Sequence, residues 1–302
     1  MKLGKLYLFL LFCAIFSFKS NAQYYFYNDE YFDSDLVWEF GGGGAMMNCI
    51  TDVGGPNTDT KFYVNEMRSK NFKLAAGIYM GVMYQNFIGL RLEGTWGSVE
   101  AKDLDITSSA SQNLVTKRNR NLSFRSKVNE IALLAEFHPL NLKYYDEGPP
   151  RLSPYILAGV GYFWYNPQTE VGGRRIDLQP LRTEGQGFDE YPDRHQYKLS
   201  SVNIPLGLGV RYELSPLFNL RVEYIHRILF TDYLDDASNR YYANPNLFIN
   251  YLPVKDAAYA KALSNPSKNG KVPARRGNPD DNDTYMSLNI KFGIVLGRQP
   301  RY

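Results

Sequence analysis

The chain has 302 residues, with 34 Lys and Arg, 31 Asp and Glu, and two cysteines. Three of the bases, Lys2, Lys5 and Lys19, lie in an N-terminal segment without acids, so the rest of the chain holds 34 less 3, or 31, bases against 31 acids. A chain without net charge gives no electrostatic basis for binding nucleic acid, and we exclude that partner.

The N-terminal segment has the pattern of a secretory signal peptide. An apolar stretch at 6–18 follows the first lysines, and a small-x-small pattern at 20–22 is typical of a signal-peptidase site. We therefore expect residues 1–22 to be removed, which leaves Cys49 as the only cysteine. One cysteine excludes an internal disulfide and a Cys-rich zinc site. No later stretch offers the ~18 apolar residues of a membrane-spanning helix.

Residues 23–35 form an aromatic and acidic segment that we expect to be a periplasmic arm, either a docking arm or an anchor at the membrane interface. Cys49 is either buried and inert or linked to another chain by a disulfide. The candidates for contact with a partner are Tyr24, Tyr25, Phe26, Tyr27, Tyr31, Phe32 and Cys49.

Alternating apolar and polar residues then predict eight β-strands within a single barrel domain at 36–302. The last strand shows the pattern most clearly, because Leu288, Ile290 and Phe292 alternate with Asn289 and Lys291. The predicted strands are 36–47, 72–84, 87–98, 127–137, 154–165, 202–212, 220–229 and 285–297.

The polar faces of these strands carry charges of both signs opposite continuous apolar stripes. This arrangement predicts an all-β, eight-stranded antiparallel transmembrane barrel of the outer membrane, with lipid outside and a polar lumen. An ion path through the lumen is an alternative to a salt-bridged plug, and we favour the plug. The predicted lumen residues are Arg91, Glu93, Glu130, Glu136, Arg211, Arg221, Glu223, Arg227 and Lys291.

Connection lengths alternate between long and short, as in outer-membrane barrels, and an even strand number predicts that both termini lie in the periplasm. A barrel of eight strands is only wide enough for its own side chains, so we expect no diffusion pore. Function is then expected in loops, ends or surfaces. The longest loop contains a predicted helix at 256–263.

Other chemical patterns in the sequence favour structural roles. His138, His195 and His226 have no Ser or acid fixed beside them by sequence, so we predict no catalytic residue. The acids at 230–236 lack the spacing of an EF-hand and indicate a capped turn instead of a calcium site. The glycines at 41–44 lack the Lys-Ser/Thr of a phosphate-binding loop, and we expect them either to let the strand bend or to make room for bulky neighbours. No cofactor or metal is predicted.

Three segments together carry a family resemblance: Thr183-Glu184-Gly185-Gln186-Gly187, the strand at 204–212, and the stretch at 227–236. They resemble the PorG-type outer-membrane barrel family of the type IX secretion and gliding machinery of Bacteroidetes. Arg275-Arg276-Gly277 and the terminal strand also fit this family, whereas Thr51 replaces its usual glycine near the first strand.

The resemblance implies a non-enzymatic component that anchors a periplasmic ring of the PorK/PorN type, PorK being a lipoprotein. We expect docking through the arm and the turns at 138–153 and 213–219, or at the barrel wall. The alternative is a stand-alone small barrel for adhesion or envelope stability. A lipid-modifying barrel enzyme is a third reading.

Overall fold

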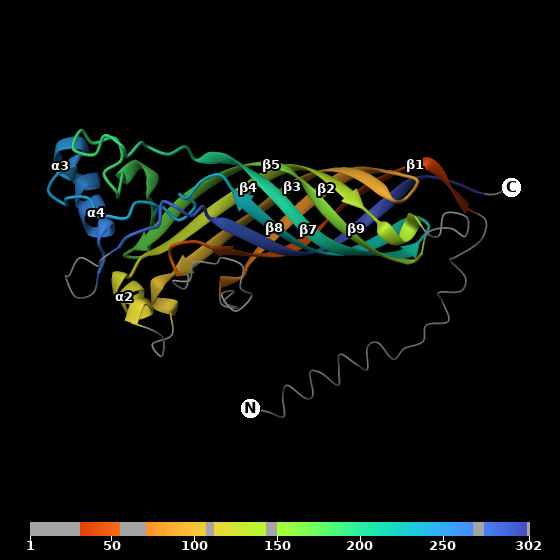
Figure 1. The fold of residues 1–302 in the computed structure, drawn as a ribbon, viewed down its shortest axis with the longest axis horizontal. Helices are drawn as coiled ribbons and strands as arrows, with labels where there is room; N and C mark the ends of the chain where they lie inside the picture. The colour runs from red at the N-terminus through yellow and green to blue at the C-terminus, as the bar shows by residue number, and fades with distance from the viewer. Residues whose placement is uncertain (1–30, 55–70, 107–111, 143–149, 268–274, 301–302) are drawn as a thin grey trace, which may run out of the picture.

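A computed structural model describes residues 31–54, 71–106, 112–142, 150–267 and 275–300, and it shows a long antiparallel β-barrel (Figure 1). The predicted signal peptide lies outside the described residues, as do Tyr24, Tyr25, Phe26 and Tyr27 of the predicted arm.

Eight strands form the barrel, and each pairs with its neighbour in the chain while the last pairs with the first, which closes the sheet. This confirms the predicted fold class. A ninth strand, β6 (Arg174–Asp177), pairs antiparallel with the last residues of β5, 168–171, beyond the closed part of the barrel. The barrel strands are β1 (Tyr31–Ile50), β2 (Lys73–Tyr84), β3 (Ile88–Lys102), β4 (Ser123–Phe137), β5 (Leu152–Val171), β7 (Ser200–Ser215), β8 (Phe218–Leu229) and β9 (Thr284–Pro300).

Strand β1 begins before the predicted start at residue 36. Tyr31 and Phe32 pair with Pro300 and Gln299 of β9, followed by a register irregularity before Trp38. The end of the predicted arm therefore continues the first strand. The difference arises because backbone groups pair wherever a neighbouring strand offers partners, whether or not the side chains alternate in polarity.

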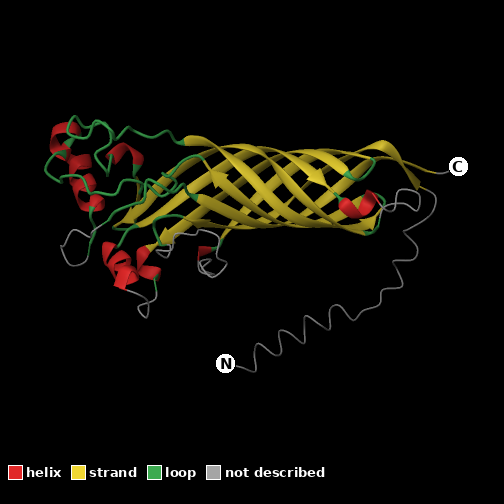
Figure 2. Cartoon of the chain, in the orientation of Figure 1, coloured by secondary structure: helices red, strands yellow, loops and turns green. Residues whose placement is uncertain are grey.

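The two ends of the barrel differ (Figure 2). The short turns, the start of β1 and the end of β9 lie at one end of the barrel, together with the 3₁₀ turn η5 (Pro139–Leu142). We call this end the terminal end. The opposite end, here called the loop end, carries the helices. None of the described helices is both long enough and apolar enough to cross a membrane. The helices are α2 (Gln112–Arg120), α3 (Phe248–Tyr251) and α4 (Val254–Ser264), with 3₁₀ turns η4 (Asp103–Asp105) and η6 (Gln179–Leu181).

The predicted helix at 256–263 is confirmed inside α4. Helices α2 and α3 were not predicted. Helix α2 carries Asn119 and charged residues and has no apolar stripe to signal it, and α3 is a single turn.

The barrel is apolar outside and polar inside. Outward-facing Leu90, Ile131 and Phe292 are 49%, 51% and 61% exposed, whereas inward-facing Glu93 and Lys291 are 3% and 2% exposed. This polarity is the reverse of a soluble barrel and is that of a membrane barrel of the outer-membrane type.

Gly41 shows why the first strand is rich in glycine. A Cβ atom at Gly41 would lie 2.6 Å from the Tyr79 ring and 2.3 Å from the Phe292 carbonyl oxygen. The missing side chain lets the Tyr79 ring lie across the lumen, which confirms for Gly41 that the glycine makes room for a bulky neighbour.

Candidate functional site: the lumen network and the loop cap

Arg91 is the centre of the charged network in the lumen. Its guanidinium forms two hydrogen bonds to Glu223, at 2.6 and 3.2 Å, and lies 2.8 Å from Glu136 and 3.2 Å from Glu93. Since the four side chains come from β3, β4 and β8, a single arginine ties together three walls of the barrel.

Arg221 makes a second two-point contact, with Glu39. Nε and Nη2 of Arg221 lie 2.6 and 2.8 Å from the two carboxylate oxygens of Glu39, and Nη1 lies 2.9 Å from Glu136. The Tyr79 hydroxyl also donates to Glu39. Sequence reasoning missed Glu39, although its place two residues from the inward-facing Val37 and Gly41 put it on the lumen face.

The remaining predicted lumen charges lie on the same inner face. Lys291 contacts Glu93 at 2.6 Å and Glu223 at 2.8 Å, and the Arg227 Nε lies 2.7 Å from Glu130. Arg211 is 5% exposed, but the ion pairs found among the described residues do not include it. The structure thus brings eight of the nine predicted residues into ion pairs that fill the lumen.

His138 forms the only close Ser–His–acid arrangement found in the described part of the chain. Its Nδ1 is 2.9 Å from the Ser153 hydroxyl and its Nε2 is 3.4 Å from Glu136. His138 and Ser153 are fully buried, and Ser153 donates to Asn141 at 3.0 Å. A nucleophile needs an accessible space beside it for the reacting group, and this buried arrangement leaves none. The hydrogen bonds of His138 and Ser153 instead fasten the turn of η5 to the barrel.

The other two histidines do not join such an arrangement. His195 is exposed in the loop between β5 and β7, and His226 is half-buried on the outward face of β8. No group of three or more His, Cys, Asp or Glu side chains in the described ranges is placed to hold a metal ion.

An apolar layer closes the lumen toward the loop end. Met47, Phe163 and Tyr285 are fully buried there, and the Cys49 thiol lies in the same core with 9% of the residue exposed. A disulfide from Cys49 to another chain would require this layer to open. Val37, Met83 and Val295 form a smaller apolar layer at the terminal end.

Beyond the apolar layer, the four connections at the loop end are joined through buried polar groups. We call their described parts, 51–54, 103–106, 112–122, 172–199, 230–267 and 275–283, the loop cap. Arg120 of α2 pairs with Asp103 through two contacts of 2.8 Å. It also donates to the backbone oxygens of Asp52, at 2.8 Å, and of Arg276. Arg120 therefore holds three connections together.

Arg276 makes the corresponding links to the connection between β5 and β7. Its Nη2 donates to the Thr183 hydroxyl at 2.8 Å and to the Asp236 carbonyl oxygen at 3.1 Å, and its Nε lies 3.2 Å from Glu184. Glu184 in turn accepts from Asn239 at 2.6 Å. Two segments that carry the family resemblance, 183–187 and 227–236, thus meet at Arg276.

Among the acids of 230–236, Asp235 caps a turn, as predicted. The Asp235 carboxylate accepts from the backbone N–H of Ala237 at 2.9 Å and of Val53 at 2.8 Å. Sequence reasoning recognised the turn but not the bond to the distant first connection. That bond depends on two loops meeting in space, which no local pattern reveals.

Burial perturbs the carboxyl groups of the loop cap. Desolvation raises the pKa of Asp52 to about 6, with the Asp235 charge adding to the rise. Desolvation also raises the pKa of Glu184 to about 7, against the lowering effect of Arg276. The loop cap is therefore held less tightly when both carboxyls are ionised.

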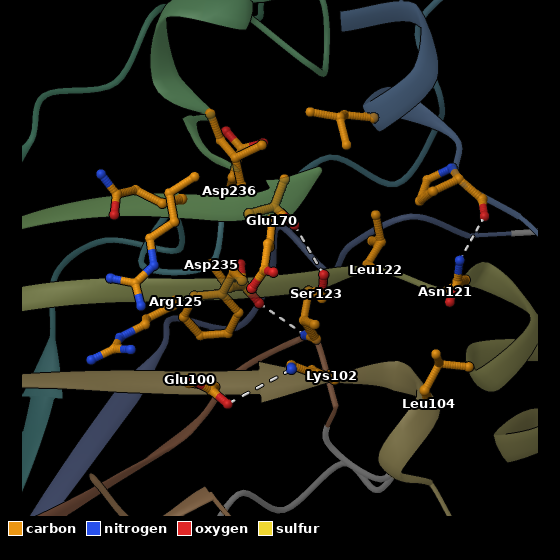
Figure 3. Close-up of a pocket in the computed structure, with 18 of the residues that line it drawn as sticks. Glu100, Lys102, Leu104, Asn121, Leu122, Ser123, Arg125, Glu170, Asp235 and Asp236 are labelled. Carbon is orange, nitrogen blue, oxygen red and sulfur yellow. Dashed lines mark hydrogen bonds and ion pairs between the residues drawn. The ribbon is translucent and has the colours of Figure 1, made fainter. Parts of the chain in front are cut away.

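A cavity of about 520 Å³ lies beside the loop cap (Figure 3). Arg125 of β4 and Glu170 of β5 line it, together with Asp235 and Asp236 from the connection that follows β8. The Ser123 hydroxyl at its wall is 3.0 Å from that of Thr169. Its volume is in the range of small-molecule sites, and its lining is charged with both signs.

A family model described as a domain of unknown function (DUF6089) matches residues 45–259, which is more than half of the chain. The chain belongs to this family. The match includes seven barrel strands in whole or in part and much of the loop cap. In this chain the family domain is therefore a membrane β-barrel. A comparison with curated protein sequences gives no match.

Similar solved structures are small outer-membrane barrels. Neisserial surface protein A is 10% identical with a TM-score of 0.37, and the match covers 87% of this chain and 98% of that chain. Ail, the attachment invasion locus protein of Yersinia pestis, was solved in complex with the heparin analogue sucrose octasulfate. It is 10% identical with a TM-score of 0.38, and the match covers 87% of this chain and 100% of that chain. OprG from Pseudomonas aeruginosa is 11% identical with a TM-score of 0.36, and the match covers 87% of this chain and 97% of that chain. At these TM-scores the fold assignment rests on the strand pairing of the chain itself.

Proposed function

We propose that this protein is a non-enzymatic structural barrel of the outer membrane, with both termini in the periplasm, which works through its two ends and not through its lumen. The observation that carries this proposal is the lumen itself, where Arg91 and Arg221 bridge opposite walls between two apolar layers. Alternating short turns and long connections support the orientation, because outer-membrane barrels have short periplasmic turns.

One finer role is that of a stand-alone barrel for adhesion or envelope stability. The loop cap favours it, since Arg120 and Arg276 hold the long connections in one arrangement beyond the apolar belt. A fixed surface loses little conformational entropy when it binds a partner. This role predicts that deletion of the gene weakens the envelope or attachment while protein export continues.

The second finer role is that of a component of the type IX secretion or gliding machinery, bound to a periplasmic ring of the PorK/PorN type. The family resemblance supports this role, and so does the pairing of β1 with β9 beyond the ends of β2 and β8. The pairs Tyr31 with Pro300 and Phe32 with Gln299 extend the terminal end, and this two-stranded extension is a surface on which a periplasmic partner can dock.

A deletion strain separates the two roles. Its secreted proteins and its detergent sensitivity are measured side by side, with the intact gene restored as the control. Loss of export of many cargo proteins, together with co-purification of periplasmic ring proteins on the tagged barrel, supports the secretion role. Normal export with a leaky or non-adhesive envelope supports the stand-alone role. Normal export, envelope and attachment together would overturn both.

A further inference from the structure

An aromatic row marks where the apolar belt of the barrel ends on β3, β4 and β5. Trp96 pairs with Asn129, and Asn129 pairs with Trp164. The two indoles face outward and are 48% and 45% exposed. Trp and Tyr collect where a membrane meets water. The row therefore places the membrane surface at the loop end, and the same three strands continue past it.

Two bases stand on the outward face of β4 directly beyond this row. Lys127 lies two residues from Asn129 in the direction of the loop end, and Arg125 lies two residues further. Lys127 is exposed and Arg125 is half-buried. Residues two apart in a strand share a face and lie about 7 Å from each other. Both cations are thus at the level of lipid headgroups.

Neither base is neutralised by the protein within the described residues. No ion pair found there includes Arg125 or Lys127, and Glu100, the acid paired across from Arg125, lies 3.0 Å from Lys73 and 3.9 Å from Lys102. The Nη2 of Arg125 donates to the Ser98 hydroxyl at 3.3 Å. Its Nε is buried and has no hydrogen-bond acceptor. Two cations without a counter-charge from the described part of the protein favour a ligand that supplies an anionic oxygen at this level.

We propose that Arg125 and Lys127 bind the phosphate of a membrane lipid whose headgroup lies in the leaflet at the loop end. The guanidinium supplies a planar pair of donors for two phosphate oxygens, and the ammonium supplies a second charge nearer the membrane. Arg125 also lines the 520 Å³ cavity, which extends away from the membrane level. That cavity leaves room for the polar group attached to the phosphate, a sugar in a phosphorylated glycolipid.

The test measures lipid binding by the full chain reconstituted in nanodiscs. The probes are vesicles containing a phosphorylated glycolipid, vesicles of the same lipid without its phosphates, and inorganic phosphate as a competitor. The double variant R125Q/K127Q is compared with K255Q/K261Q, which neutralises two exposed lysines of α4 far from the membrane level. The heat-dependent gel shift shows that each variant is folded.

We expect R125Q/K127Q to bind the phosphorylated lipid roughly 30-fold more weakly, because each base near a charged membrane surface contributes about 1 kcal/mol. K255Q/K261Q should bind as the wild type does. If R125Q/K127Q does not fold, K127Q alone should weaken binding about 5-fold. Equal binding by wild type and R125Q/K127Q, or equal binding of the lipid without phosphates, would overturn the proposal. Full displacement of the lipid by millimolar inorganic phosphate would show that the site binds free phosphate, and it would overturn the proposal that a lipid is the ligand.

Discussion

Arg221 and Glu39 meet inside the lumen and join through two hydrogen bonds of 2.6 and 2.8 Å. Arg221 is on β8 and Glu39 is on β1, so the pair bridges strands that are separated by β9 in the sheet. Both side chains are shielded from water, and Arg221 also contacts Glu136 at 2.9 Å. Such a pair fixes the relative position of the barrel walls.

Removing one member of this pair should destabilise the barrel. Glu39→Gln leaves the Arg221 charge buried with only Glu136 opposite it, and we expect a loss of about 3 kcal/mol in the free energy of unfolding. The midpoint of urea unfolding in micelles measures it. Glu170→Gln changes an exposed acid of β5 and should shift the free energy by less than about 0.5 kcal/mol. Equal midpoints for the two variants would contradict a structural role for the pair.

The glycines of β1 provide a matched test of packing in the lumen. Gly41→Ala places a methyl group against the Tyr79 ring and the backbone of β9, whereas a Cβ at Gly44 meets no atom within 4 Å. We therefore expect Gly41→Ala to reduce the folded fraction strongly and Gly44→Ala to fold normally. The fraction of unboiled protein with the mobility of the folded barrel measures this. If Gly41→Ala folds as well as Gly44→Ala, close packing of Gly41 against Tyr79 is not required for folding.

The loop cap should loosen without loss of the barrel when Arg120 is removed. Arg120→Ala leaves the buried Asp103 carboxylate without its partner, at a cost of about 3 kcal/mol, which corresponds to a roughly 100-fold larger open population. Limited proteolysis should cut the long connections faster while the heat-dependent gel shift persists. Arg240→Ala removes an exposed ion pair with Asp280 at 3.1 Å and should change cleavage little. Equal cleavage of both variants would rule out this role for Arg120.

Acidification should tighten the loop cap. The pKa values of Asp52, about 6, and Glu184, about 7, are raised above their ordinary values of 3.8 and 4.5. The closed cap therefore binds more protons than the open one between about pH 4 and 7, and its stability rises as pH falls through this window. For Glu184 the full effect is about 3 kcal/mol.

Hydrogen exchange of the backbone N–H groups at 183–187 and 235–239, corrected for intrinsic rates, measures this dependence. Exchange should slow by more than tenfold from pH 8 to pH 5.5, and Glu184→Gln should remove most of the change. Exchange that is faster at pH 5.5 than at pH 8 would show that the sign is wrong.

The barrel was predictable from sequence because its information is local. Alternation along 285–297 and seven similar segments determines which face of each strand meets lipid, and the charges at Arg91 and Glu223 follow from that alternation. The start of β1 at Tyr31 was not predictable, because it depends on backbone pairing with the end of β9.

The loop cap lay beyond prediction for a different reason. Thr183, Asp236 and Arg276 are far apart in sequence and sit in segments without periodicity, so only the folded chain shows that they meet. The resemblance to a known family singled out these segments without indicating their contact. Glu39 is the opposite case, since its inward position followed from the alternation of β1 and was overlooked.

Planar-bilayer recording of the purified, folded full chain measures whether the lumen is filled. We expect no steady conductance at ±100 mV for the wild type, because the ion pairs of Arg91, Arg221 and Lys291 and the apolar layers occupy the interior. Stable, reproducible single-channel openings of the wild-type barrel would contradict it and would assign the protein to the channels.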